Sequence, residues 1–199
     1  PRFQNVAGDL GLSVNGLAGG LSVSDFNGDG FLDLLMTGWG LTEPIRVFLA
    51  DGTGGYVDRS EAAGLRGIVG GLNTIHADYD NDGDQDMVVA KCGCDPVDIL
   101  MRNNGDGTFT NVAPALGLSD SHSSWSSAWG DFDNDGDMDV LIGSSGSATS
   151  KLMRNDGTSF TNVNAGSGFD LFTGTSIEWT THDFNNDGNL DILGGGRLM

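Results

Sequence analysis

A nine-residue acidic segment occurs four times in this chain and constrains its fold more than any other feature. Residues 131–139 read DFDNDGDMD, and related segments begin at Asp25, Asp78 and Asp183, with their first aspartates 53, 53 and 52 residues apart. Each segment has aspartate or asparagine at positions 1, 3, 5 and 9 and glycine at position 6. Loops that wrap oxygen ligands around Ca²⁺ have this pattern, and a cation relieves the repulsion between such closely spaced carboxylates. We therefore expect four calcium-binding loops.

The predicted ligands are the side chains at positions 1, 3, 5 and 9 and the backbone carbonyl at position 7 of each loop. In chain order these residues are Asp25, Asn27, Asp29, Phe31 and Asp33; Asp78, Asp80, Asp82, Asp84 and Asp86; Asp131, Asp133, Asp135, Asp137 and Asp139; and Asp183, Asn185, Asp187, Asn189 and Asp191. Asparagine at position 3 offers an oxygen but no charge, so the first and fourth loops should bind calcium more weakly.

The residues around the loops predict strands rather than helices. An EF-hand needs an acidic residue at position 12, where this chain has Met36, Val89, Ile142 and Gly194. Each unit of about 53 residues has four strand-like runs and no sustained helical periodicity. Four short antiparallel strands at this period are typical of a propeller blade. We predict an all-β fold, a β-propeller of about four blades with an acidic loop between the first and second strands of each.

The motif D-x-[DN]-x-D-G-x-x-D, repeated in phase, resembles the FG-GAP/VCBS repeats of integrin-α-like propellers and many secreted bacterial proteins. The resemblance covers nearly the whole chain and implies about four Ca²⁺ ions. Related propellers often have seven blades, whereas this chain has material for about four. We expect a single propeller domain over residues 1–199, its last blade completed by the N-terminal strand (PRFQNV) or by another chain. A fragment, or half of a two-chain ring, stays open as an alternative.

Composition limits the partners and the compartment. The formal charge of −19 argues against nucleic acid, and the acidic loops supply 16 of the 28 Asp and Glu residues. No apolar run reaches the ~18 residues that a membrane helix needs, so we expect no membrane insertion. Weak calcium sites fill where calcium is near millimolar, which favours an extracellular or cell-surface location. Cys92 and Cys94 are equally compatible with free thiols and with a local disulfide.

The repeats also divide the chain into a uniform part and a variable part. Aromatic residues recur in phase at position 2 of the loops and at the start of the fourth strand, so we expect them to pack between blades. The members are Phe26, Tyr79, Phe132, Phe184, Phe3, Tyr56, Phe109 and Phe160. Trp129 and Trp179, on predicted inner strands, are expected in the core. Trp39, after a second strand, and Trp125, before a first strand, lie in unit-specific insertions.

Trp39 and Trp125 are the candidate ligand-contacting residues, with a lid over the core as the alternative. In an up-and-down blade the variable connections share the face opposite the acidic loops, where recognition is expected. The three histidines have different offsets from the loops, and no catalytic motif is present, so we expect no enzyme. The predicted function is recognition or adhesion toward a protein or glycan. The alternatives are a structural building block, which includes a homo-oligomer that completes the ring, and an accessory domain of a larger secreted enzyme.

Overall fold

The computed structural model describes residues 2–14, 18–40, 42–91, 97–119, 124–144, 149–169, 178–194 and 197–198. These residues form four antiparallel sheets, three with four strands and one with three. The strands are β1 (Ala18–Ser24), β2 (Asp33–Gly38), β3 (Arg46–Ala50) and β4 (Tyr56–Asp58); β5 (Asn73–Ala77), β6 (Asp86–Ala90), β7 (Ile99–Asn103) and β8 (Phe109–Asn111); β9 (Ser124–Gly130), β10 (Asp139–Ser144), β11 (Lys151–Asn155) and β12 (Phe160–Asn162); and β13 (Trp179–His182), β14 (Asp191–Gly194) and β15 (Arg197–Leu198). One four-residue helix, α1 (Ala113–Leu116), follows β8. The predicted all-β class is confirmed.

Each acidic segment is the hairpin between the first two strands of a sheet. The first strand ends just before position 1, and position 9 is the first residue of the second strand. The closing pairs are Ser24 with Asp33, Ala77 with Asp86, Gly130 with Asp139, and His182 with Asp191. The predicted placement of the loops is therefore confirmed in all four units.

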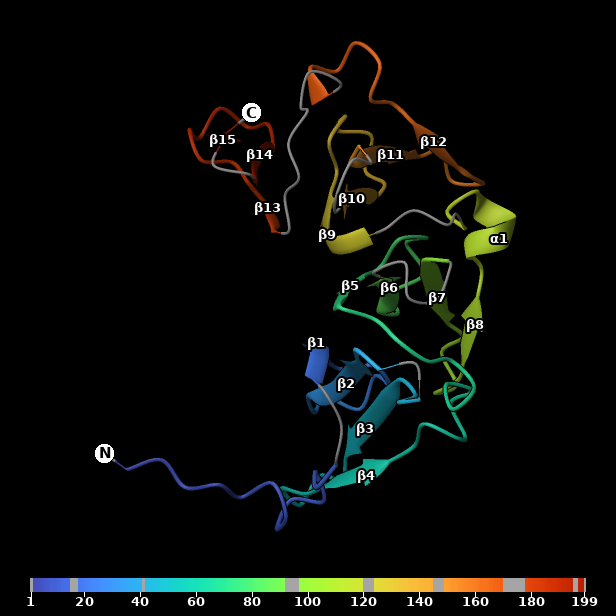
Figure 1. Ribbon diagram of the computed structural model, residues 1–199, viewed down its shortest axis with the longest axis vertical. Coiled ribbons are helices and arrows are strands. Elements are labelled where there is room, and N and C mark those ends of the chain that lie inside the picture. Colours follow the sequence, from blue (N-terminus) through green and yellow to red (C-terminus); the bar gives the residue numbers. More distant parts are fainter. Residues whose placement is uncertain are drawn as a thin grey trace.

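The four sheets follow one another along an arc (Figure 1). The first strands lie on the inside, where β1 contacts β5, β5 contacts β9, and β9 contacts β13. In Figure 1 the first and last sheets are the two ends of this arc, so the described residues do not form the predicted closed ring. Residues 2–14 contain no strand and lie beside the first sheet, at the opposite end of the arc from β13–β15. Completion of the last sheet by the N-terminus or another chain stays a prediction.

Apolar residues alternate along the central strands and bury both faces of the middle sheets. In β6, Met87 and Val89 join the core between the first and second sheets, whereas Val88 joins the core between the second and third. In β10, Val140 belongs to that second core and Leu141 to a third core against the last sheet. Successive side chains of a strand point to opposite faces, so the sheets are held together by apolar packing on both sides.

Aromatic residues reinforce two of these contacts. Phe26, at position 2 of the first loop, packs edge-on against Phe109 with ring centroids 6.2 Å apart. Tyr79 packs against Phe160 in the next sheet at the same separation. The predicted packing role between units is confirmed for these pairs. It is wrong for Phe3, which is fully exposed because residues 2–14 form no strand against a neighbouring sheet.

The outer face of the last sheet is partly exposed. Leu193 is the second residue after its loop's final aspartate and is 38% exposed, whereas Leu141 at the same position of the third sheet is 0% exposed. Phe184 is 41% exposed, against 2% for the equivalent Phe26. No other described sheet covers this apolar face.

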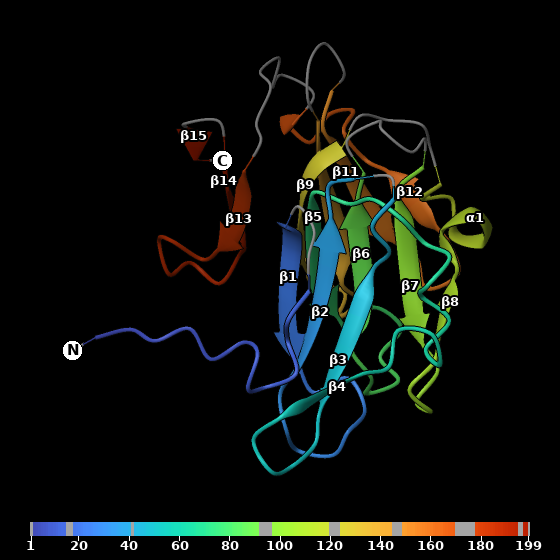
Figure 2. The same cartoon turned by 60° about the horizontal axis from the view of Figure 1, so that its bottom comes forward.

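The acidic hairpins and the variable connections lie at opposite ends of the sheets. Figure 2 shows β1 running toward its hairpin and β2 running away from it. The β2–β3 connection and the connection from β4 to β5 are therefore at the other end, as the sequence predicted. The described part of the chain holds no helix that could cross a membrane.

Candidate metal centres

The acidic loops are shaped by hydrogen bonds from the backbone to the aspartate at position 1. In the second loop the N–H groups of Asp82 and Gly83 donate to the two oxygens of Asp78, each at 3.0 Å. The equivalent pair of bonds recurs in the other three loops. Each loop therefore closes on its first carboxylate with the same geometry.

Position 4 of every loop adopts a left-handed backbone conformation that the sequence analysis did not single out. Gly28, Asn81, Asn134 and Asn186 have φ between 58° and 71°. Glycine and asparagine are the residues that adopt this conformation most readily. The signal was present in the sequence, since only these two types occur at position 4. Glycine at position 6 is also left-handed, as at Gly83 with φ of 96°.

The aspartate at position 9 is anchored by two N–H groups from different parts of its sheet. Asp86 is fully buried and accepts from the N–H of Tyr79 at 3.2 Å and from that of Asn103 at 2.7 Å. Asp33 and Asp139 are buried and held in the same way, the second N–H coming from Ala50 and Asn155. The end of the third strand thus positions the last carboxylate of the loop, a role that the sequence analysis missed.

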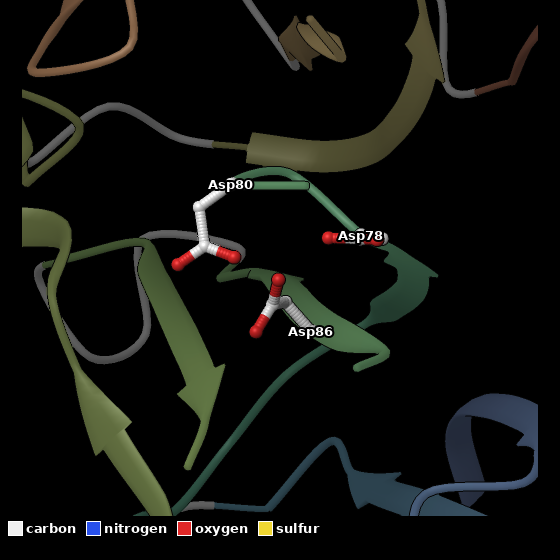
Figure 3. Close-up of side chains that lie close together, drawn as sticks. All are labelled: Asp78, Asp80 and Asp86. Carbon is white, nitrogen blue, oxygen red and sulfur yellow. The ribbon is translucent and has the colours of Figure 1, made fainter. Parts of the chain in front are cut away.

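The second and third loops each bring three carboxylates together. One oxygen from each of Asp78, Asp80 and Asp86 lies within 4.8 Å of the others, and Figure 3 shows these side chains converging. Positions 1, 3 and 9 of the third loop form the equivalent group of Asp131, Asp133 and Asp139. Oxygen ligands lie 2.3–2.6 Å from Ca²⁺, so two ligands of one ion are at most about 5 Å apart. The residues of both groups therefore fit a single hard cation.

Position 5 lies outside these two groups of carboxylates. Asp82 instead accepts a hydrogen bond from the N–H of Asp84 at 2.9 Å, and Asp135 accepts from the N–H of Asp137 at the same distance. Asp29 and Asp187 have the equivalent bond to position 7 in the first and fourth loops. Coordination by position 5, and by the carbonyls of Phe31, Asp84, Asp137 and Asn189 at position 7, stays a prediction.

The first and fourth loops hold fewer acidic groups. Asn27 and Asn185, at position 3, each accept from the N–H of position 5 through the side-chain oxygen. Asp33 is buried in the first loop, whereas Asp191 is only half-buried in the fourth. The weaker calcium binding expected for these two loops rests on their lower charge and stays a prediction.

Burial and the charges of neighbouring carboxylates disfavour the charged form of Asp80, Asp86 and Asp139. Burial raises the pKa of Asp86 to about 7, against the lowering effect of its two N–H donors, and the charges of Asp80 and Asp82 add to the rise. Burial likewise raises the pKa of Asp139 to about 6. The pKa of Asp80 is raised first by burial and then by the charges of Asp82 and Asp78. A bound cation reverses this balance because it stabilises the ionised carboxylates.

The tryptophans separate into core and exposed residues. Trp129 and Trp179 are each 8% exposed and belong to the apolar cores, as predicted. Trp39 is 53% exposed and follows β2. Trp125 is 37% exposed and lies within β9, not before the first strand as predicted, because β9 extends through its pair between Ser124 and Ser144. Cys92, Cys94 and His122 lie outside the described residues.

Models of two related repeat families match the part of the chain that contains the first three acidic loops. The FG-GAP-like repeat matches residues 25–89 and 78–142, and the FG-GAP repeat matches residues 123–166. The first two matches begin at position 1 of an acidic loop and together cover more than half of the 199 residues. This chain belongs to the FG-GAP-like repeat family. The resemblance noted from the acidic motif is therefore confirmed.

One solved structure extends the comparison to the whole fold. The FG-GAP-like repeats superpose on the crystal structure of Bap1, a biofilm matrix protein of V. cholerae, with a TM-score of 0.52 and 18% sequence identity. The match covers 92% of this chain but only 29% of Bap1. At this identity the likeness concerns the fold alone. No curated protein sequence matches the chain.

Proposed function

We propose that this chain is an extracellular calcium-binding module for recognition or adhesion, whose four sheets are consecutive blades of a β-propeller. The observation that carries the proposal is the grouping of three carboxylates in the second and third loops. The four sheets follow the repeat order, with their first strands in contact along the inside of the arc, which supports the propeller. FG-GAP repeats and the likeness to a biofilm matrix protein support a role outside the cell.

Calcium would be held by the carboxylates at positions 1, 3 and 9, with further oxygens from position 5 and the position-7 carbonyl. Bound Ca²⁺ would supply the positive charge that lets the buried carboxylate at position 9 stay ionised. Its role is structural, since it would fix the hairpin at the end of each sheet. Sites of this kind are filled where calcium is near millimolar, which is consistent with an extracellular location.

Recognition is proposed at the end of the sheets opposite the acidic hairpins. Trp39 follows β2, and Trp125 is near the start of β9, so both belong to this end. A cavity of about 600 Å³ also lies there, lined by Pro44, by the start of β3, by the end of β4 and by residues that follow β4. Exposed aromatics and a cavity lined by charged residues, at the same end of the sheets, suit a glycan or a peptide.

Arginine in this cavity favours an anionic group on the ligand. Three arginines line it on a chain of formal charge −19. Arg46 pairs with Asp58 at 3.1 Å, and Arg66 pairs with Glu61. Arg59 has no ion-pair partner in the part of the chain that the structure describes. The Arg59 guanidinium can therefore donate to a carboxylate or sulfate of a partner.

Binding of the purified protein to immobilised acidic and neutral polysaccharides, with and without calcium, tests this function. We expect retention on an acidic polysaccharide in 1 mM Ca²⁺ (a probe condition near the extracellular level) and loss of retention in EGTA. Arg59→Ala and Trp39→Ala should lower retention at an unchanged melting temperature. Arg154→Ala is the matched control, because Arg154 lies at the acidic-hairpin end and pairs with Asp156. Equal retention of all three variants would contradict recognition at this end.

The second candidate function, a structural building block, is favoured by the exposed apolar face of the last sheet. Leu193 and Phe184 are both exposed there, and faces of this kind are sites of association. Native mass measurement tests it: a defined oligomer that Leu193→Glu dissociates would favour the building block, and a monomer would favour the recognition module.

A further inference from the structure

Two buried asparagines connect the acidic loops of neighbouring sheets. Asn103 ends β7 and is 1% exposed, and Asn155 ends β11 and is 2% exposed. Each has its backbone and its side chain hydrogen-bonded to different loops. Neither residue belongs to an acidic segment, so the repeat motif alone does not reveal this role.

Asn103 contacts both the first and the second loop. Its N–H donates to Asp86, the last carboxylate of the second loop, at 2.7 Å. Its side-chain amide donates to the carbonyl of Gln85 at 3.3 Å, in the same loop. The amide also donates to the carbonyl of Phe26 at 2.8 Å, at position 2 of the first loop. One fixed side chain thus bridges two candidate metal centres in adjacent sheets.

Asn155 repeats the same set of bonds one sheet further on. Its N–H donates to Asp139 at 2.7 Å, and its amide donates to the carbonyls of Met138 at 3.3 Å and Tyr79 at 2.8 Å. The register relative to the loops is identical, since Tyr79 is position 2 of the second loop and Met138 is position 8 of the third. The bridge is therefore a feature of the repeat and not of one interface.

These bonds continue directly to the carboxylates of the preceding loop. The N–H of Phe26 donates to Asp33 at 2.9 Å, and the N–H of Tyr79 donates to Asp86 at 3.2 Å. The residue that receives the asparagine amide therefore also holds the last carboxylate of its own loop. A hydrogen-bonded path runs from Asp139 to Asp86, and the next path runs from Asp86 to Asp33.

The last residue of the third strand has two roles, in which its N–H holds the final carboxylate of the loop and its side chain bridges to the preceding loop. The first sheet has only the former role. Ala50 ends β3, where its N–H donates to Asp33 at 2.8 Å, but alanine has no amide to reach another loop. Holding the carboxylate thus needs only the backbone, whereas bridging needs asparagine. In the described residues, asparagine occupies this position in the second and third sheets. Each of these sheets has a preceding sheet whose acidic loop the amide can reach.

We propose that Asn103 and Asn155 are positioning residues that couple neighbouring loops, so that cations bind to them cooperatively. This inference rests on the proposed calcium binding. A cation in one loop fixes its last carboxylate, and the asparagine transmits that order to the neighbouring loop. A second cation then binds a loop that is already ordered, so less conformational entropy is lost on binding. Couplings of this kind typically change affinity about 5-fold to 150-fold.

Calorimetric titration with Ca²⁺ tests the coupling between the second and third loops, which Asn155 bridges. Asp25→Asn and Asp183→Asn first weaken the outer loops, so that two sites dominate. The affinity of the third loop is then compared with the second loop intact and with that loop neutralised by Asp78→Asn and Asp80→Asn. We expect neutralisation to weaken the third loop at least about 5-fold. A second bond joins these two loops, from the Asn81 amide to Asp137 at 2.8 Å, and Asn81→Gly removes it in all proteins compared. In that background Asn155→Ala should reduce the factor to about 1, because it removes the remaining bridge but keeps the N–H.

Asn104→Ala is the matched control, since this exposed amide bonds only within its own hairpin, to Arg102, Thr108 and Thr110. It should leave the coupling factor unchanged. Asn155→Ser, which also keeps the N–H, replaces the alanine variant if that protein does not fold. Independent affinities in the starting protein, or an unchanged factor after loss of Asn155, would overturn the coupling alone. Absence of any calcium binding would overturn the proposed function and the coupling with it.

Discussion

Alanine substitution of two leucines at equivalent positions, one in the third sheet and one in the last, measures how completely the outer face of each sheet is shielded from water. Leu141 and Leu193 are both the second residue after the final aspartate of their loops. Leu141 is 0% exposed and lies in the core between the third and last sheets, whereas Leu193 is 38% exposed. The pair Leu141→Ala and Leu193→Ala therefore compares the same substitution at the same register position in two environments.

The expected costs follow from burial. Leu141→Ala removes a fully buried side chain and leaves a cavity, which typically costs about 3–5 kcal/mol of unfolding free energy. Leu193→Ala removes a side chain already in contact with water, and water fills the space, so its cost should be about 1 kcal/mol. We expect the two variants to differ by at least about 2 kcal/mol.

Urea denaturation in excess calcium, followed by tryptophan fluorescence and circular dichroism, measures both costs. The slope of unfolding free energy against urea must stay constant, since a changed slope would mean separate unfolding of the last sheet. Costs equal within about 1 kcal/mol would refute the reasoning. They would mean that the outer face of the last sheet is covered in solution, by a second copy or by another segment.

Two further predictions concern the loops and the inner strands. Asn134 has φ of 60°, so Asn134→Ala should cost about 1–2 kcal/mol more than Asn134→Gly in chemical denaturation, and equal costs would contradict a strained position 4. Burial lowers the pKa of His76, so the unfolded state takes up this proton first and the His76 contribution to stability should be lost as pH decreases below about 6.5. The raised pKa values of Asp86 and Asp139 act in the opposite direction. His76→Gln should lose less unfolding free energy than the starting protein as pH is lowered through this range, and identical pH profiles of the two proteins would contradict the shift.

The repeat pattern predicted the loops and the order of the strands because both depend on local sequence. Aspartate at alternate positions and glycine at position 6 define a hairpin whose geometry needs no distant contact. The recurrence of aromatic residues in phase then predicted that they pack between units. The same reasoning placed Phe26 and Tyr79 between sheets, where both are found.

The contacts between sheets were harder to predict. Asn103 and Asn155 lie 17 and 16 residues after their loops' final aspartates, and Ala50 occupies the equivalent position of the first unit. Because the first unit has alanine at this position, asparagine does not recur in every unit. Its bridging role becomes visible only once the loop that it contacts is known. Phe3 matched the outer-strand phrase but packs against nothing, because that phrase has no neighbouring sheet in the structure. The repeated sequence pattern predicts each four-stranded unit. Closure of the ring depends on contacts at the first and last sheets, which the pattern does not specify.

The central claim is that the acidic loops bind calcium and that calcium stabilises the fold. Thermal unfolding of the chelated protein, repeated in 1 mM Ca²⁺ and in 1 mM Mg²⁺, tests it most directly. With Kd on the order of 10⁻⁴ M, each occupied loop contributes about 1.4 kcal/mol, so the two aspartate-rich loops contribute about 3 kcal/mol. The melting temperature should therefore rise by about 6–12 °C in calcium and by much less in magnesium, which demands a smaller octahedral site. An unchanged melting temperature in calcium would contradict the account.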